Sequence, residues 1–315
     1  MLRKAVRIFI WMFLCAVPAS LWAAEPPYRF AVVGDSRGGD NGINALIVGE
    51  QLTALLGENI DLAIATGDLV SDGTLAQLQN WIASFKAPLE AAGIAVYPCR
   101  GNHDGDLATW NTAFSGPHAL PNNGPAGEEG ATYAVAHKNA LFLCLDGFVN
   151  LYSVNQTWID EQFQQNELPH VFTYCHLPAF SAYHVDCLGT RRLARNAFWA
   201  SLGRVGSVVY FTGHDHFYNH ARAQDSAGWW IHQYIVGTGG APLYDWDGLY
   251  KLDPGVELIA YEKNYGYLVV EVNELDVTLT FKARVAPGVY EATSDVFQYT
   301  GPMRGEGVPR CGAIP

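Results

Sequence analysis

Residues 94–104 read Ile-Ala-Val-Tyr-Pro-Cys-Arg-Gly-Asn-His-Asp. The apolar run 94–98 has the length and composition of a buried strand. Gly101-Asn102-His103-Asp104 follows it and brings together a neutral oxygen donor, an imidazole and a carboxylate. Asn binds a metal only as one ligand among several, so this stretch predicts a polar site whose other ligands lie elsewhere in the chain.

Strand-like and helix-like segments alternate before this stretch. Residues 29–33 and 60–66 read as short buried strands, and residues 43–56 and 75–85 have helical spacing. A strand, helix, strand, helix, strand order predicts βαβ units and a parallel sheet. Further expected elements are hairpins at 131–145 and 267–283, helices at 156–168 and 191–202, and strands at 171–175, 207–211 and 229–236.

These patterns predict one α/β domain, residues 25–286, in which two packed sheets carry helices on their outer faces. We expect residues 287–315, which are polar with Gly and Pro, to form an irregular tail packed on that domain. The composition agrees with a globular domain, because 49% of the 315 residues are apolar and 16% are charged. The net charge of −12 disfavours a nucleic-acid-binding surface. A negative protein still binds phosphate esters if metal ions supply positive charge.

The N-terminus has the pattern of a signal peptide over residues 1–24. Basic residues come first, residues 8–17 are almost wholly apolar, and Ala23-Ala24 precedes Glu25. We therefore expect export to a periplasm or out of the cell, with no membrane span in the mature chain, whose net charge would be −15 after loss of three basic residues. Five cysteines remain, and Cys187 and Cys311, both in loop-like surroundings, are expected to pair.

Metal-type residues follow apolar strand candidates at five places, by one to four residues each. They are Asp35, Asp68, Asn102, His176 and His214. Open α/β sheets bind ligands beyond the carboxyl ends of their strands, so these residues predict one polar site at one rim. Gly-Asp and Gly-Asn are also ordinary turn dipeptides, which would explain any single case but not five. His216 lies two residues after His214, so in extended backbone both rings point to the same side.

In these residues the chain resembles the calcineurin-like metallophosphoesterases, the family that includes purple acid phosphatases. The resemblance extends from about Phe30 to Tyr218. It rests on these motifs in the family's order: Gly34-Asp35, Gly67-Asp68, Gly101-Asn102-His103-Asp104, His176 before Leu177-Pro178, and Gly213-His214-Asp215-His216.

The resemblance implies a four-layer α/β/β/α sandwich of two mixed sheets, with the metal site at the carboxyl ends of the strands. It also implies two divalent cations, for which we expect Mn, Fe or Zn. Asp68 would bridge the ions. Asn102, His176 and His214 would complete one site, and Asp35 and His216 would serve the other.

The implied activity is hydrolysis of a small-molecule phosphate mono- or diester by attack of a metal-bound hydroxide. His103 would lie near the leaving group and give it a proton. Asp104 is expected either to orient that imidazole or to act as a turn or supporting carboxylate. His184 and Tyr218 are candidates for contact with the substrate, and exposed or structural roles remain open for both.

One position departs from the family's pattern. Many members carry His two residues after the first Asp, where this chain has Arg37. Arg is permanently cationic and does not bind metals. The first metal site is then one ligand short, to be filled by water or by an oxygen of Asp40 or Asn41. Arg37 would otherwise grip a phosphate oxygen or form a structural salt bridge.

Two other functions stay open beside the two-metal enzyme. They are a single-metal hydrolase with Arg37 as a substrate-binding residue, and a non-catalytic phosphate-binding module of the same fold. Ser71 stands where purple acid phosphatases have the Tyr that colours their iron, so a purple protein is not expected.

Overall fold

Short apolar strands pair into two mixed sheets in the computed structural model, which describes residues 26–301. The first sheet has the order β14-β13-β12-β1-β3-β4. Its strands are β1 (Tyr28–Val33), β3 (Leu62–Ala65), β4 (Ala95–Pro98), β12 (Gly266–Asn273), β13 (Asp276–Ala286) and β14 (Val289–Thr300). β1, β3 and β4 run parallel, whereas β12 pairs with β1 in the antiparallel direction.

The second sheet has the order β11-β9-β10-β8-β7-β6-β5. Its strands are β5 (Tyr133–His137), β6 (Ala140–Leu145), β7 (His170–Cys175), β8 (Val209–Thr212), β9 (Tyr218–Gln224), β10 (Trp230–Val236) and β11 (Glu257–Glu262). β6, β7, β8 and β10 are parallel. Their carboxyl ends therefore meet along one rim, as those of β1, β3 and β4 do in the first sheet.

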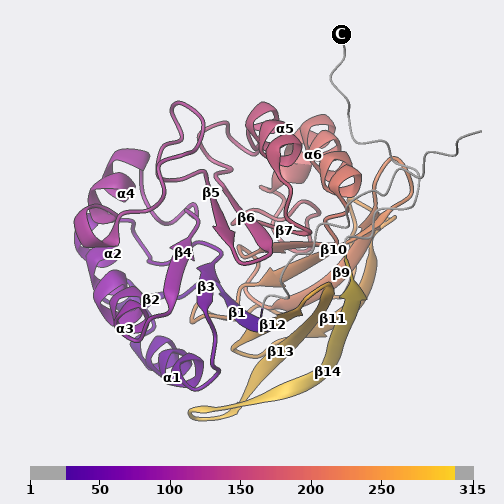
Figure 1. The fold of residues 1–315 in the computed structure, drawn as a ribbon. Helices are drawn as coiled ribbons and strands as arrows, with labels where there is room; N and C mark the ends of the chain where they lie inside the picture. Colours follow the sequence, from indigo (N-terminus) through magenta and orange to yellow (C-terminus); the bar gives the residue numbers. More distant parts are fainter. Residues whose placement is uncertain (1–25, 302–315) are drawn as a thin grey trace, which may run out of the picture.

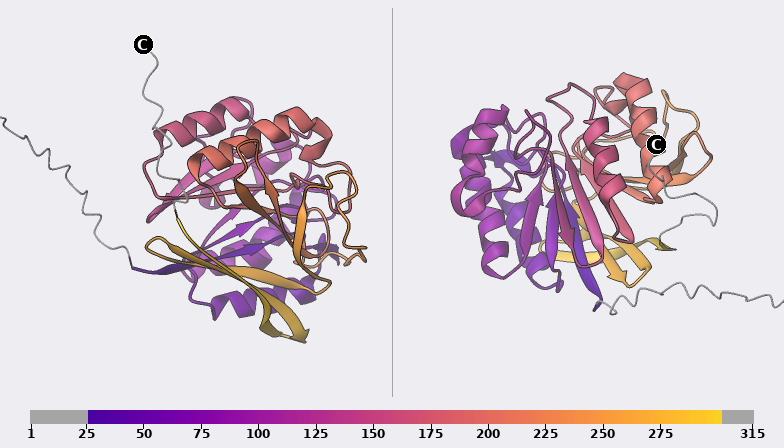
Figure 2. Two further views of the ribbon diagram at one scale, coloured as in Figure 1. Left: turned by 90° about the vertical axis from the view of Figure 1, so that its right-hand side faces the viewer. Right: turned by 45° about the horizontal axis from the view of Figure 1, so that its top comes forward.

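Helices cover the outer faces of both sheets (Figures 1 and 2). Beside the first sheet lie α1 (Ala45–Leu56), α2 (Leu75–Trp81), a π-helical turn (Ile82–Lys86), α3 (Ala87–Ala91) and α4 (Leu107–Ala113). Beside the second lie α5 (Gln156–Gln165) and α6 (Arg192–Val205). Short elements complete the order: β2 (Arg37–Asp40) and the 3₁₀ turns Gly116–His118 and Leu188–Arg191. The left view of Figure 2 shows the four layers, with the sheets between the purple and the pink helices.

Aromatic side chains fill the space between the sheets. The Phe30 ring from β1 meets the edges of Phe142 and Phe172 from the second sheet, with ring centroids 5.0 and 4.9 Å apart. Each of these rings is at most 1% exposed, so their burial supplies a large hydrophobic contribution to folding. A second apolar cluster lies between the outer face of the second sheet and helices α5 and α6. The predicted four-layer sandwich is thus confirmed.

The C-terminal segment differs from the prediction. Residues 289–300, expected within an irregular tail, form β14, whose alternating half-buried side chains pair with β13. Half of this strand faces solvent, so its sequence carries little apolar signal. The predicted signal peptide and Cys311 lie outside the described residues, and Cys187 is buried. Among residues 26–301, no helix has both the length and the apolar character needed to cross a membrane.

Candidate metal centre

The predicted ligands meet where the rims of the two sheets adjoin. Asp35, Asp68 and Asn102 follow β1, β3 and β4, and His176 and His214 follow β7 and β8. Backbone bonds lock the two halves together. The Asp35 carboxylate accepts from the backbone N–H of His214 at 3.1 Å, and His176 Nδ1 donates to the carbonyl of Thr66 at 2.8 Å. The sheet packing itself therefore assembles the site.

Three side-chain atoms form a tight triangle at this junction. Asn102 Oδ1, His176 Nε2 and His214 Nδ1 lie 3.0 to 3.1 Å from one another. His176 Nδ1 faces a carbonyl and so carries the ring proton, which leaves a lone pair on Nε2. His214 Nε2 lies 3.3 Å from the Asp186 carboxylate without a well-aligned hydrogen bond, and that negative charge favours a proton on Nε2 and the lone pair on Nδ1.

Three converging lone pairs repel one another unless a cation lies between them. Imidazole nitrogens fixed by backbone and carboxylate partners are the usual ligands of divalent transition metals. Asp68 joins this group, because its Oδ1 is 3.4 Å from His176 Nε2. The four residues Asp68, Asn102, His176 and His214 thus fit a divalent metal ion, and we call them the second site.

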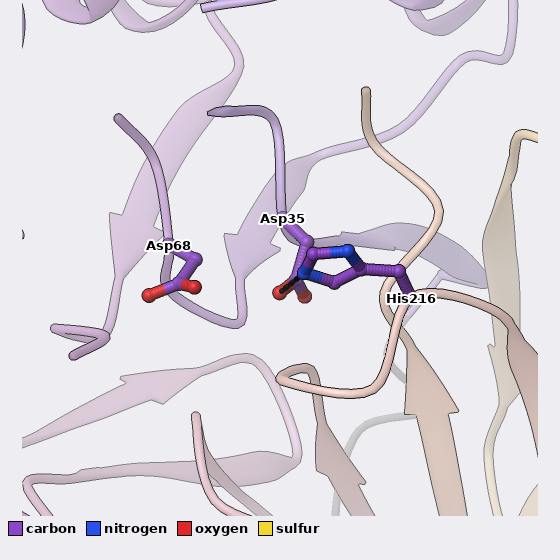
Figure 3. A group of neighbouring side chains, drawn as sticks. All are labelled: Asp35, Asp68 and His216. Atoms are coloured by element: carbon purple, nitrogen blue, oxygen red, sulfur yellow. Dashed lines mark ion pairs between the residues drawn. The ribbon is translucent and has the colours of Figure 1, made fainter. Parts of the chain in front are cut away.

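A second group of ligands shares Asp68. Asp35, Asp68 and His216 each offer an atom within 4.8 Å of the other two, and all three are buried. Figure 3 shows the Asp35 carboxylate beside the His216 ring, with Asp68 across from them. His216 Nδ1 donates to the carbonyl of Pro242 at 2.9 Å, so its Nε2 lone pair faces Asp35 Oδ1, 3.5 Å away. We call this group the first site.

Arg37 reaches into the first site. Its Nη2 is 3.3 Å from His216 Nε2, and its Nε is 3.4 Å from Asp68 Oδ2. Asp68 therefore turns one oxygen to the second site and the other to the guanidinium. The oxygens suggested as replacement ligands do not fill this role: the Asp40 carboxylate accepts from the N–H of Ala45 at the start of α1, and the Asn41 carbonyl accepts from Asn80.

The backbone at three ligands is strained. Asp35, Asp68 and His214 have φ values of 58°, 49° and 74°, in the left-handed region that costs a residue with a side chain about 1 kcal/mol or more. This conformation turns each side chain sharply into the junction. Gly101 has a different requirement, because a Cβ there would lie 2.3 Å from Asp68 Oδ1. A glycine at position 101 is thus needed for the close approach of the two loops.

At His214 burial is outweighed by the nearby carboxylates, Asp186 foremost, which raise the pKa. Burial sets the protonation of His176 and His216. It lowers the pKa of His176 to about 4 and, together with the charge of Arg37, that of His216 to about 4. Both rings are then neutral at pH 7, which is the form that binds metals. Burial and the charge of Asp68 raise the pKa of Asp35 well above its usual value. The paired carboxylates therefore call for positive charge between them.

The family model for calcineurin-like phosphoesterases matches residues 28–218, more than half of the chain. The chain is a calcineurin-like phosphoesterase. It therefore belongs to a family of metal-dependent phosphoric ester hydrolases, which supports hydrolysis of phosphate esters in general. No curated protein sequence is significantly similar to the chain.

Solved structures share the fold. A purple acid phosphatase from yellow lupin (Lupinus luteus) seeds superposes with a TM-score of 0.68 at 14% identity, covering 87% of this chain and 54% of that one. The anchor in the inner membrane complex of Plasmodium superposes with a TM-score of 0.63 at 13% identity. The match covers 90% of this chain and 91% of that one. A dimetal phosphatase from Danio rerio superposes with a TM-score of 0.57 at 14% identity. The match covers 88% of this chain and 99% of that one. This phosphoesterase spans about half the length of the lupin protein.

His103 lies at the open side of the phosphoesterase's site. Its Nδ1 donates to the carbonyl of Ser71 at 2.7 Å, and its Nε2 is 4.0 Å from Asp68 Oδ2. About a third of the ring is exposed, so Nε2 can reach a substrate. Asp104 does not orient this ring. Its buried carboxylate accepts from the backbone N–H groups of Gly101 and Val70, which is the supporting role left open by the sequence.

Aromatic rings border the ligands. His184, a predicted contact residue, has its ring centroid 4.6 Å from that of His214 and is held by Asp215 Oδ1 at 2.8 Å. Tyr244 stacks on His216 at 4.3 Å and on Tyr183 at 4.8 Å. Sequence reasoning missed Tyr244, which lies in an aperiodic loop. Asp215 stood inside the quoted Gly-His-Asp-His motif, so a signal for it existed.

Tyr218 was wrongly predicted to contact substrate. It begins β9 with its side chain pointing between the sheets, fully buried and stacked on Phe281 at 3.8 Å. Its hydroxyl donates to Asp295 of β14, which also bonds His220. His220 in turn pairs through Nε2 with His232 Nδ1 at 2.7 Å. This polar chain fastens β14 to the second sheet rather than serving the metal centre.

A buried ion pair holds the loop that carries Asn102. Arg100 Nε and Nη2 donate to the two carboxylate oxygens of Asp146 at 2.9 and 3.2 Å, and Nη1 donates to the carbonyl of Gly105 at 2.8 Å. Asp146 follows β6, so the pair joins the rims of the two sheets. The guanidinium also lies 5.6 Å from the Phe148 ring centre.

Proposed function

We propose that this phosphoesterase is an exported enzyme that hydrolyses small-molecule phosphate mono- or diesters with bound Mn, Fe or Zn. The observation that carries the metal requirement is the triangle of Asn102 Oδ1, His176 Nε2 and His214 Nδ1, 3.0 to 3.1 Å on each side. Two of these lone pairs belong to buried rings, those of His176 and His214, and a cation at their meeting point with the exposed Asn102 would stabilise all three together.

The family resemblance suggests two ions, with Asp68 between them. One Asp68 oxygen faces His176 in the second site, and the other faces Arg37 on the side where the resemblance places the other ion. Ions held by these residues would neutralise the charge of the phosphate and supply a water molecule of lowered pKa as the nucleophile.

The chain's own residues would bind and orient the ester. Arg37 presents N–H groups to a phosphate oxygen, and such charge-assisted bonds are strong and directional. His103 directs Nε2 to the open side for proton transfer to the departing alkoxide, because its Nδ1 donates to the carbonyl of Ser71 and its Nε2 lies 4.0 Å from Asp68 Oδ2. Tyr183 and Tyr244 form an apolar wall for the alcohol part.

Export is proposed from the sequence of residues 1–24. A basic start, an apolar segment and small residues before Glu25 are typical of a cleaved signal peptide. Expression of the full-length chain followed by N-terminal sequencing of the mature protein tests this proposal. A mature protein that begins at Met1 would contradict it.

The activity is tested with an aryl phosphate monoester and a bis-aryl diester. We expect hydrolysis that EDTA abolishes and that Mn, Fe or Zn restores. His103→Gln should keep bound metal but slow esters with poor leaving groups by roughly 100-fold or more, the usual contribution of a general acid. Esters with good leaving groups should be affected much less. Equal loss for both kinds of ester would contradict the acid role, and no hydrolysis of any ester would contradict the proposed function.

A further inference from the structure

We infer that Arg37 takes the place of an ion in the first site, so that the phosphoesterase holds one divalent ion and grips phosphate with a fixed guanidinium. This inference rests on the proposed function for its account of the substrate, but its metal count stands on the site alone.

Arg37 uses the same atoms that an ion in the first site would need. His216 has one lone pair directed into the site, on Nε2, because its Nδ1 proton is bonded to Pro242. That lone pair accepts from Arg37 Nη2 at 3.3 Å. The Asp68 oxygen turned to this side, Oδ2, lies 3.4 Å from Arg37 Nε. A metal ion at His216 and Asp68 would have to displace the guanidinium from both.

The charges around the first site agree with a guanidinium in place of a metal ion. Asp35 and Asp68 are both buried, and the guanidinium supplies the positive charge that their carboxylates require. A divalent cation bound to the same atoms of His216 and Asp68 would lie next to the permanently charged guanidinium and would be repelled by it. By contrast, among residues 26–301 no Lys or Arg side chain contacts the triangle of Asn102, His176 and His214, whose lone pairs remain available.

The backbone fixes Arg37 at this place. Its N–H donates to the carbonyl of Asp68 at 3.2 Å, and the following Gly38 packs so closely on Asn44 that a Cβ there would lie 2.6 Å from the backbone nitrogen. The side chain is about one-fifth exposed, so it leads from the buried carboxylates to the open side of the site.

The guanidinium also has unused donors. Arg37 Nε is buried against Asp68 Oδ2 as an ion pair, and within the described part of the chain it makes no well-aligned hydrogen bond. A phosphate oxygen placed opposite the second site would satisfy the N–H groups that face the opening. Phosphate would then bridge one metal ion and one guanidinium.

Metal content tests the inference directly. Wild-type protein, Arg37→His and the surface control Arg204→His are equilibrated by dialysis against Mn²⁺ and analysed for metal per chain. We expect about one ion in the wild type and in the control, and about two in Arg37→His, where an imidazole replaces the guanidinium. Two ions in the wild type, or only one in Arg37→His, would overturn the inference. Asn102→Ala identifies the occupied site, because it should lose the single ion.

Binding of inorganic phosphate tests the second part of the inference, the contact between Arg37 and phosphate. By titration calorimetry, Arg37→Gln should weaken phosphate binding by about tenfold to a hundredfold, as expected for loss of a charge-assisted bond, and should leave the Asn102 site loaded. Unchanged phosphate affinity in Arg37→Gln would refute the gripping role. If the wild type and Arg37→His bind one and two ions but hydrolyse no ester, the proposed function fails and the metal count stands. If neither binds metal, both fail.

Discussion

Loss of the Arg100 guanidinium should destabilise the whole domain, because it leaves the fully buried Asp146 carboxylate without its counter-ion. Removing one partner of a buried pair costs about 3–5 kcal/mol. In Arg100→Met, Asp146 Oδ1 still accepts from the backbone N–H groups of Phe148 and Val149, at 2.7 and 2.8 Å. The cost of Arg100→Met should therefore lie near the lower end of this range. Met retains the length of the side chain and its contact with the Phe148 ring.

The assay is urea unfolding of the metal-free protein, with Arg204→Met as a matched control. Arg204 forms an ion pair with Asp160 at 2.9 Å, but both side chains are largely exposed. Such a surface pair is worth about 0–1 kcal/mol. We expect Arg100→Met to lose about 3 kcal/mol of unfolding free energy, and the control to lose less than about 1 kcal/mol.

A double-mutant cycle separates the ion pair from simple packing. In an Asp146→Asn background no buried charge is left unpaired, so Arg100→Met should cost less there by roughly 2 kcal/mol, a coupling typical of residues in direct contact. A coupling below about 0.5 kcal/mol would show that the two residues act independently and would refute this account of how the rims are held.

Three further outcomes follow from the site and its surroundings. EDTA should lower the thermal unfolding midpoint of metal-loaded protein, since an ion at 100 times its Kd stabilises the fold by about 2.7 kcal/mol; an unchanged midpoint would contradict a bound ion. Burial, with His220 beside it, lowers the pKa of His232 to about 3. Stability should therefore fall as the pH drops from about 6.5 toward 3, by about 1.4 kcal/mol per pH unit from this group, because only the unfolded chain takes up the proton. His232→Asn should reduce the slope of unfolding free energy against pH by the equivalent of about one proton, as measured by urea titrations between pH 7 and 4. Tyr244→Ala should reduce kcat/KM for aryl relative to alkyl esters by roughly tenfold at most, the worth of one aromatic contact, and a constant ratio would refute the wall.

The sequence predicted the parts of the molecule in which local pattern and burial agree. β1, β3 and β4 are apolar and short, and each ends in a ligand-bearing turn, so the strand ends and the ligands Asp35, Asp68 and Asn102 could be predicted together. β14 could not, because only alternate side chains of this edge strand are half-buried. Tyr244 was also out of reach, since only the three-dimensional path of its loop brings it onto His216.

Two roles within the motifs also required the structure. Asp104 is adjacent to His103 in sequence, yet its carboxylate points back to the N–H groups of Gly101 and Val70. Arg37 could be recognised as a departure from the family, but the sequence did not indicate that its guanidinium would contact His216 and Asp68 at once.

The order of strands in the first sheet also bears on how the chain folds. β1 lies between β3 and β12, and the register Tyr28↔Val272 joins residues from opposite ends of the chain. Contacts at such separation carry a large loop-closure entropy and slow the folding transition. During synthesis β1 can pair with β3 early, but its other edge stays open until residues 266–273 have emerged. A chain that ends before that point would present an unpaired apolar strand and would be prone to aggregate.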